Sequence, residues 1–150
     1  MQFESVNDVL DFAIKNEQEA FRFYSDLAGR MDNDTTRKTF EGYAQEEKGH
    51  EAKLKAIKEG KQLEPAQNEV LDLKLSDYLV KEEPNSKMDY QDALILAMKK
   101  EKAAFRFYND LAASTSDGNL QNIFLALAQE EAKHKLRFEI EYDEKILREN

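Results

Sequence analysis

The chain has 150 residues, of which 35% are charged and 41% are hydrophobic, and it contains only two prolines and five glycines. This length gives one domain, residues 1–150, with a sizeable core, and the composition favours long helices over strands. The formal net charge of −9 argues against nucleic acid or an anionic membrane surface as a partner. The absence of cysteine excludes disulfides, thiolate zinc sites and cysteine-ligated iron–sulfur clusters.

Neither a secretory signal pattern nor an apolar run of the ~20 residues that a membrane span requires is present in the sequence. We therefore expect a cytoplasmic protein that has no membrane partner.

The first two predicted elements are helices over residues 6–30 and 34–60, in which apolar residues recur at spacings of three and four. Ser5 and Asp8 form a capping pair at the start of the first helix. The polar segment Asp32–Asp34 marks the turn between the two helices. Together they predict a helical hairpin.

Residues 61–88 form the predicted connection to the second half of the chain, and they contain Pro65 and Pro84. This connection is long enough to run the height of a helical bundle, which would leave the second and third helices parallel. Its segment "VLDLKLSDYLV", residues 70–80, is apolar enough to pack on the bundle, with a short helix expected after Ser76.

The last two predicted helices cover residues 89–114 and 119–148, separated by a turn at Ser116–Gly118, and Asp89 with Asp92 repeats the first capping pair. A shift of 84 residues aligns this hairpin with the first. Between residues 13–50 and 97–134, 17 of 38 positions are identical. The predicted fold class is all-α: a four-helix bundle of two repeated hairpins joined by one long crossover.

Six polar residues lie in phase with the apolar stripes and are therefore predicted to point inward. Four buried carboxylates cost several kcal/mol each in lost hydration, on the order estimated for buried ions, and they also repel one another. No lysine or arginine shares these stripes nearby, so two divalent cations are the natural compensation. The predicted metal ligands are Glu17, Glu47, His50, Glu101, Glu131 and His134.

The spacing of these residues suits metal binding, because residues three apart on a helix share a face and each Glu-x-x-His pair can present an oxygen and a nitrogen to one point. Glutamate and histidine suit iron or manganese, with iron favoured for oxygen or peroxide chemistry. Four nearby glutamates are expected on a solvated face: Glu19, Glu46, Glu51 and Glu130. Four phenylalanines are expected in the core: Phe21, Phe40, Phe105 and Phe124.

Tyr24 and Tyr108 lie seven residues after Glu17 and Glu101, on the same stripes. Either their hydroxyl groups hydrogen-bond to ligand carboxylates, or they are ordinary core tyrosines. The spacing does not choose between these alternatives.

The paired segments "KNEQEAFRFY" with "AQEEKGH" and "KKEKAAFRFY" with "AQEEAKH" resemble the rubrerythrin branch of the ferritin-like family over nearly the whole chain. The resemblance implies a ferritin-like bundle that holds a non-haem di-iron centre. In that centre Glu47 and Glu131 would bridge two irons, and the other four residues would be terminal ligands. It also implies a homodimer, in some relatives with exchange of helices.

Two features depart from the family pattern. Typical rubrerythrins end in a rubredoxin-like domain with four cysteines, whereas this chain has none, so we expect an external electron donor such as a rubredoxin-like protein. Typical members also carry another glutamate three residues after the third-helix ligand. Here that position is Ala104, matched by Ala20 in the first repeat, which puts efficient peroxidase activity in question.

The leading hypothesis is a di-iron protein that is redox-active toward hydrogen peroxide or dioxygen, in the oxidative-stress role of rubrerythrins. Three alternatives stay open: iron binding or sequestration with slow ferroxidase activity, a di-manganese catalase-like centre, and a structural bundle without metal.

Overall fold

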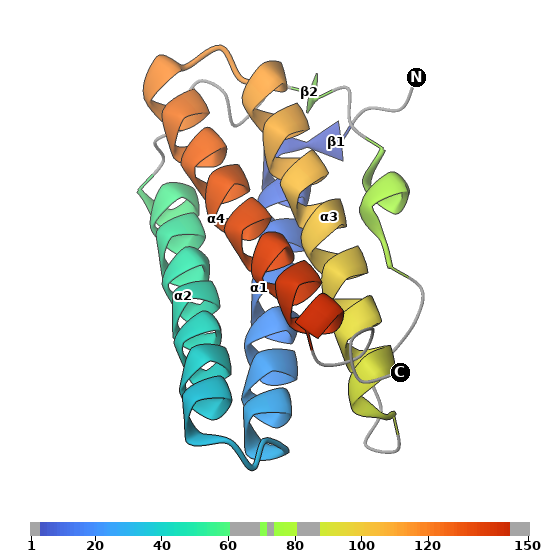
Figure 1. The fold of residues 1–150 in the computed structure, drawn as a ribbon. Helices are drawn as coiled ribbons and strands as arrows, with labels where there is room; N and C mark the ends of the chain where they lie inside the picture. Colours follow the sequence, from blue (N-terminus) through green and yellow to red (C-terminus); the bar gives the residue numbers. More distant parts are fainter. Residues whose placement is uncertain (1–3, 61–69, 72–73, 81–87, 145–150) are drawn as a thin grey trace. The chain divides into compact units, whose positions relative to one another are not determined.

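The computed structural model describes residues 4–60, 70–71, 74–80 and 88–144. The chain divides into two compact units, Met1–Leu75 and Ser76–Asn150, and each contains one helical hairpin (Figure 1). The first hairpin consists of α1, Val6–Gly29, and α2, Asp34–Glu59; the second consists of α3, Tyr90–Ser114, and α4, Gly118–Tyr142. The predicted hairpins are therefore confirmed.

The helix boundaries agree with the prediction to within one residue, except at the end of α4. That helix was predicted to reach residue 148, but its α-helical hydrogen bonding ends at Tyr142 and a π-helical turn follows at residues 143–144. Residues 145–150 lie outside the described residues.

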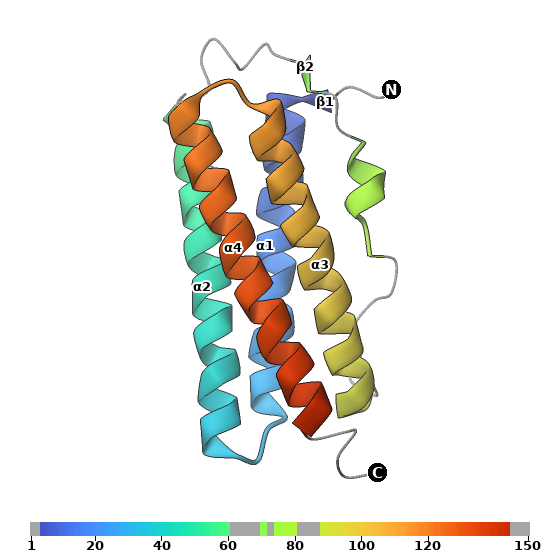
Figure 2. The same ribbon diagram turned by 45° about the horizontal axis from the view of Figure 1, so that its top comes forward.

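In the first unit, α1 and α2 run antiparallel and lie side by side in both ribbon views (Figure 2). Ser5 caps α1, because its Oγ accepts a hydrogen bond from the backbone N–H of Asp8 at 3.1 Å. Lys58 of α2 forms an ion pair with Asp11 of α1. The core of this unit is formed by stripes from both helices, in which Leu10, Leu27, Leu54 and Ile57 are at most 2% exposed.

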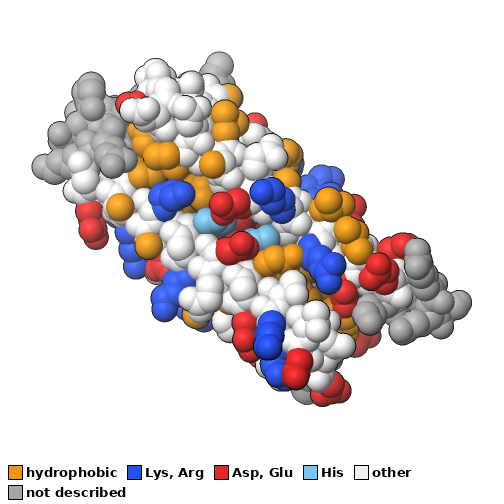
Figure 3. Space-filling model, turned by 60° about the vertical axis from the view of Figure 1, so that its left-hand side comes forward, with side chains coloured by type: hydrophobic (Ala, Val, Ile, Leu, Met, Phe, Trp, Pro, Cys, Tyr) orange, Lys and Arg blue, Asp and Glu red, His pale blue; other side chains and the backbone are white. Residues whose placement is uncertain are grey.

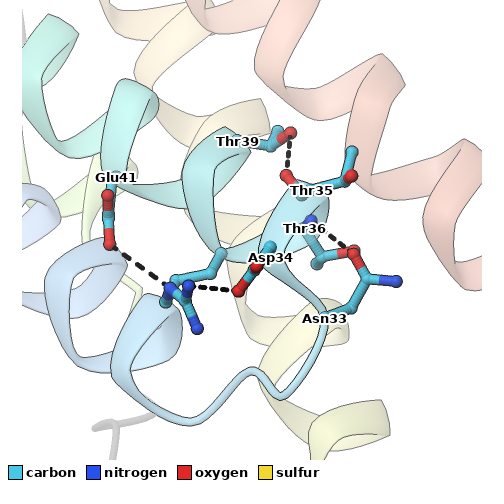
Figure 4. Close-up of polar contacts among 7 residues, drawn as sticks. Asn33, Asp34, Thr35, Thr36, Thr39 and Glu41 are labelled. Atoms are coloured by element: carbon cyan, nitrogen blue, oxygen red, sulfur yellow. Dashed lines mark hydrogen bonds and ion pairs between the residues drawn. The ribbon is translucent and has the colours of Figure 1, made fainter.

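The start of α2 is held by local side-chain contacts (Figure 4). The side chain of Asn33 accepts a hydrogen bond from the backbone N–H of Thr36 at 3.1 Å, which satisfies one of the unpaired donors of the first turn. Arg37 forms ion pairs with Asp34 and, at 3.8 Å, with Glu41. These contacts fix the point at which the chain turns back.

A short antiparallel pairing joins β1, Glu4–Ser5, to β2, Val70–Leu71. The pairing places the segment after α2 against the residue that caps α1. The sequence does not predict this pairing, because two-residue strands give no periodic signal.

In the second unit, α3 and α4 also run antiparallel and side by side (Figures 1 and 2). Asp89 and Asp117 cap them by accepting hydrogen bonds from the backbone N–H groups of Asp92 and Leu120 at 2.8 and 3.0 Å. The core includes Leu94, Leu111, Leu120, Phe124 and Phe138, all at most 2% exposed.

The crossover contributes η2, a 3₁₀-helix at Leu75–Tyr78, close to the short helix expected after Ser76. Tyr78 is buried and packs on α3, as predicted for this apolar segment, whereas Leu79 is 56% exposed. The rest of the predicted crossover, including Pro65 and Pro84, lies outside the described residues. Among the described helices, none combines the length and the apolar character that crossing a membrane would need.

Candidate metal centre

The first hairpin brings together Glu17 from α1 with Glu47 and His50 from α2. All three are buried, at 2%, 1% and 4% exposure. The Nδ1 atom of His50 lies 3.5 Å from a carboxylate oxygen of Glu17 and 3.5 Å from one of Glu47. One ligand atom from each of the three residues lies within 4.8 Å of the others.

The second hairpin repeats this cluster with Glu101 from α3 and with Glu131 and His134 from α4, each 2% exposed. The Nδ1 atom of His134 lies 3.7 Å from Glu101 Oε1 and 3.8 Å from Glu131 Oε1. The ligand atoms of these three residues again lie within 4.8 Å of one another. Each hairpin therefore gathers the three residues that its sequence predicts to converge.

Helix geometry explains the convergence. Glu47 and His50, like Glu131 and His134, are three residues apart on one helix and so project from the same face. The remaining glutamate comes from the antiparallel partner helix, 30 residues earlier in the chain in both hairpins. The short turn between the helices sets the register that brings the two faces together.

The donor atoms fit a divalent metal ion. The six residues have other interactions, but one buried oxygen or nitrogen of each makes no hydrogen bond among the described residues. Ligands at about 2.1 Å from one ion, near right angles, lie about 3 Å apart. The observed separations of 3.5–3.8 Å need only a small contraction to reach this geometry. An ion in each cluster would also balance its two buried carboxylates.

The neighbouring glutamates differ from the clusters in exposure. Glu46 is exposed, as predicted, whereas Glu19, Glu51 and Glu130 are half-buried. Lys55 lies 2.7 Å from Glu51, and Gln18 of α1 donates a hydrogen bond to it at 2.8 Å. These two contacts, Lys55 first, lower the pKa of Glu51.

Tyr24 and Tyr108 are buried at 1% and 2% exposure, as their stripes predict. The ring of Tyr24 lies 5.5 Å from that of Phe23 and 6.1 Å from that of Tyr43, and the ring of Tyr108 lies 5.2 Å from that of Phe107. A hydrogen bond from either hydroxyl to a ligand carboxylate stays a prediction.

The phenylalanine predictions are only partly right. Phe40 and Phe124 are buried in the core, but Phe21 and Phe105 are half-buried. Phe21 has a polar neighbour, because the ammonium of Lys48, an exposed residue of α2, lies 5.4 Å from the centroid of its ring.

Two hydrogen-bonded side-chain pairs of the second unit were not predicted from the sequence. Tyr78 donates a hydrogen bond to Asp110 at 2.6 Å, and Tyr90 donates one to the buried Glu141 at 2.9 Å. Glu141 follows the buried Phe138 by three residues on the same stripe as His134, so continuing the stripe by one helical turn would have found it. Tyr78 gave no such signal, because it lies in the crossover.

The exposed surface mixes both signs of charge. On the face shown in Figure 3, acidic and basic side chains are interspersed, and a small area of histidine surface lies beside acidic side chains. The imidazoles are thus covered almost completely, in agreement with their 4% and 2% exposure.

Comparison with known proteins places this geometry in a family. The family model for rubrerythrin matches residues 8–142. A protein from Thermotoga maritima, described as a ferritin-like diiron-carboxylate protein, has 20% sequence identity and a TM-score of 0.80, covering 97% of this chain and 98% of its own. A hypothetical protein from Pyrococcus furiosus has 27% identity and a TM-score of 0.68, covering 90% and 86%. None of the curated proteins matches in sequence.

These likenesses show that the fold is a ferritin-like four-helix bundle made of two hairpins. The family match extends over both clusters and almost the entire chain, from the first turn of α1 to the end of α4. The chain therefore belongs to the rubrerythrin family.

Proposed function

We propose that the two clusters combine in the bundle core as one non-haem di-iron centre, which reacts with hydrogen peroxide or dioxygen. The observation that carries this proposal is the repeated convergence of two carboxylates on a histidine Nδ1 atom, at 3.5 Å in one hairpin and 3.7–3.8 Å in the other. Ferritin-like bundles build two-metal sites from one glutamate on each of two helices and Glu-x-x-His on each of the others. Membership of the family supports the same use here.

The ligand roles are those that the resemblance to rubrerythrins implies. Glu47 and Glu131 would each contact both metal ions, while Glu17, Glu101 and the two histidines would each hold one. Four carboxylates against two divalent ions give a neutral centre with neutral imidazoles, so the buried charges are compensated. Iron is the proposed metal, and manganese suits the same donors.

The reduction of hydrogen peroxide to two waters consumes two electrons and two protons, and two bound ferrous ions would supply the electrons. The protein's own residues would hold the metal ions in place and keep water out of the site. Phe40 and Phe124, at 2% and 1% exposure, lie two helical turns before Glu47 and Glu131 on the same helices, and their burial would help to keep water from the site. An external donor restores the electrons, since the 150 residues contain no cysteine to ligate an iron–sulfur or rubredoxin-type centre.

A second candidate function is iron binding or sequestration with slow ferroxidase activity. Ala20 and Ala104 favour it, because neither hairpin offers a further carboxylate one turn after its first glutamate. Storage requires a multi-subunit shell, whereas the proposed redox protein is a homodimer. Size-exclusion chromatography separates the two, and a large assembly would support storage.

Anaerobic stopped-flow mixing of the di-ferrous protein with hydrogen peroxide tests the leading proposal. We expect the protein-bound iron to be oxidised faster than free ferrous iron under the same conditions. Glu47→Ala should abolish the fast phase, and Glu46→Ala, at the exposed neighbouring position, should retain it. Oxidation of the wild-type protein no faster than free iron would contradict the redox function.

A further inference from the structure

Tyr78 of η2 is docked on α3 through both its ring and its hydroxyl group. The hydroxyl donates a hydrogen bond to Asp110 Oδ2 at 2.6 Å. The ring packs edge-on against Phe107, with centroids 5.3 Å apart and planes at 70°. Tyr78 is only 8% exposed, but its partner Asp110 is exposed. The phenol is therefore sheltered, while the group that accepts its proton is open to water.

The ring contacts continue inward from Tyr78. Phe107 lies 5.2 Å from Tyr108, which is 2% exposed and shares the α3 stripe with Glu101. Seven residues separate Tyr108 from Glu101, or about 10 Å along a helix. Tyr78, Phe107 and Tyr108 thus form a continuous run of aromatic rings from the outer side of α3 toward its buried metal-ligand cluster.

We propose that Tyr78 is a redox-active tyrosine, which takes up oxidising equivalents that escape from the buried cluster and passes them to a reductant in solution. This proposal rests on the proposed function, because a bound ferrous ion that gave hydrogen peroxide only one electron would leave ferric iron, hydroxide and a hydroxyl radical, and this radical is the one-electron oxidant. Phe107 bridges the two tyrosines, and Tyr108 is the inner end of the relay.

The hydroxyl radical takes one electron from the phenol of Tyr78 through the aromatic rings and becomes hydroxide. The phenolic proton moves along the 2.6 Å hydrogen bond to the Asp110 carboxylate. The products are a neutral tyrosyl radical and a protonated carboxyl group. A soluble one-electron reductant such as ascorbate then returns the electron, and Asp110 returns the proton.

The electrostatics around Tyr78 favour this coupled transfer over loss of the electron alone. Burial, followed by the hydrogen bond to Asp110 and the charge of that carboxylate, raises the pKa of Tyr78, so the phenol stays protonated at neutral pH. The guanidinium of Arg106 lies 5.8 Å from the ring centroid and opposes a positive charge on the ring. Proton transfer to Asp110 removes that charge.

The first hairpin supplies an internal control. Arg22, Phe23, Tyr24 and Asp26 occupy the positions equivalent to Arg106, Phe107, Tyr108 and Asp110. The Phe23–Tyr24 ring contact, at 5.5 Å, matches the one in α3. Duplication alone therefore explains the two buried rings, whereas the tyrosine hydrogen-bonded to the aspartate is described only in the second unit.

The first test uses the metal-free, full-length protein, oxidised by a flash-generated ruthenium(III) tris-bipyridyl complex and freeze-quenched for electron paramagnetic resonance. We expect Tyr78→Phe, which keeps the ring packing, to lower the tyrosyl radical yield at least threefold. Asp110→Asn should slow radical formation and remove its solvent deuterium isotope effect, and Asp26→Asn should change neither. An unchanged radical yield in Tyr78→Phe would overturn the proposal.

The second test treats the iron-loaded protein with hydrogen peroxide. We expect a Tyr78 radical in the wild type and at least a threefold lower yield in Phe107→Leu, with folding checked by circular dichroism. If peroxide oxidises the bound iron and no Tyr78 radical forms, the relay is wrong. If the bound iron is not oxidised faster than free iron, the proposed function fails, while the photochemical result still decides whether Tyr78 is redox-active.

Discussion

The two hairpins have the same triad of two glutamates and a histidine at equivalent positions, but several polar contacts around the triad differ. In the first hairpin, Gln18 and Lys55 both contact Glu51, the residue after His50. In the second, the residue after His134 is Lys135, which pairs with Glu139 at 2.6 Å. The charge beside the histidine is thus reversed, while the histidine itself and its two glutamates are the same.

A similar contrast holds at the ends of the hairpins. Tyr90 and Glu141 form a hydrogen-bonded pair in the second unit, and the equivalent positions in the first are the apolar Val6 and Ile57, both buried. The packing at this end of the repeat has therefore diverged, because many side-chain combinations fill a core. The buried glutamates and histidines have not been replaced by apolar residues, although that exchange would stabilise a metal-free bundle.

The largest predicted effect comes from removing a ligand, and it should be equal in the two hairpins. Glu47→Gln and Glu131→Gln should each abolish most of the stabilisation that bound metal provides, about 2.7 kcal/mol at a metal concentration 100 times the Kd. In the metal-free protein, the same changes should raise stability, because each removes one buried negative charge near another. Thermal unfolding with and without metal measures both effects.

The matched controls are Glu46→Gln and Glu130→Gln, one position before each ligand. Neither should change the stabilisation by metal. A ligand effect confined to one hairpin would show that the two clusters are not equivalent.

The Tyr90–Glu141 pair gives the next largest effect. Tyr90→Phe leaves the buried carboxylate of Glu141 without this donor and should cost about 1–3 kcal/mol of unfolding free energy. The double change Tyr90→Val with Glu141→Ile copies the pair of the first hairpin and should recover most of that loss. Urea unfolding measures both variants. A double variant less stable than Tyr90→Phe would contradict the interpretation that the two pairs are interchangeable.

Alkaline pH should act on the second unit through the same pair. Burial, followed by the charge of Glu141 and the hydrogen bond to it, raises the pKa of Tyr90 above its ordinary value of 10.0. A group whose pKa is raised in the folded state contributes stability that is fully present below pH 10 and is lost as the pH rises toward the folded-state pKa. Tyr90→Phe should therefore flatten the alkaline fall in stability, measured by chemical unfolding from pH 9 upward. An identical slope would contradict this.

The smallest loss of stability is predicted for changes at the equivalent N-caps of α1 and α3. Ser5→Ala and Asp89→Ala should each cost about 1 kcal/mol, because each removes the acceptor for a backbone N–H of the first turn. Ser5→Thr and Asp89→Asn, which keep an acceptor, serve as controls and should cost less. Thermal unfolding would detect the difference, and a loss below 0.3 kcal/mol in both, far under the typical value of about 1, would contradict the capping role.

Sequence alone was enough to predict the helices and the inward-facing glutamates and histidines, because both follow from periodicity. Glu17, Glu47 and His50 lie on the same helix faces as the apolar residues over several helical turns. Residues on other faces of these helices would point to solvent. The repeat strengthened the prediction, because the same phase recurs 84 residues later.

Sequence reasoning failed where contacts are non-periodic or long-range. The packing of the crossover segment around Tyr78 was predicted, but the β1–β2 pairing and the hydrogen bond from Tyr78 to Asp110 were not, because no local pattern shows which residues the crossover meets. The contact of the half-buried Phe21 with Lys48 of α2 is likewise not visible in the phase of its own helix.

The metal content of the protein purified without added metal tests the central claim most directly. If each hairpin supplies half of one two-metal centre, elemental analysis should find two metal ions per chain, mainly iron. His50→Ala and His134→Ala should each lower that content by at least one ion. A wild-type protein with no bound metal even after anaerobic incubation with ferrous iron, or one whose metal content is the same in both variants, would contradict the claim.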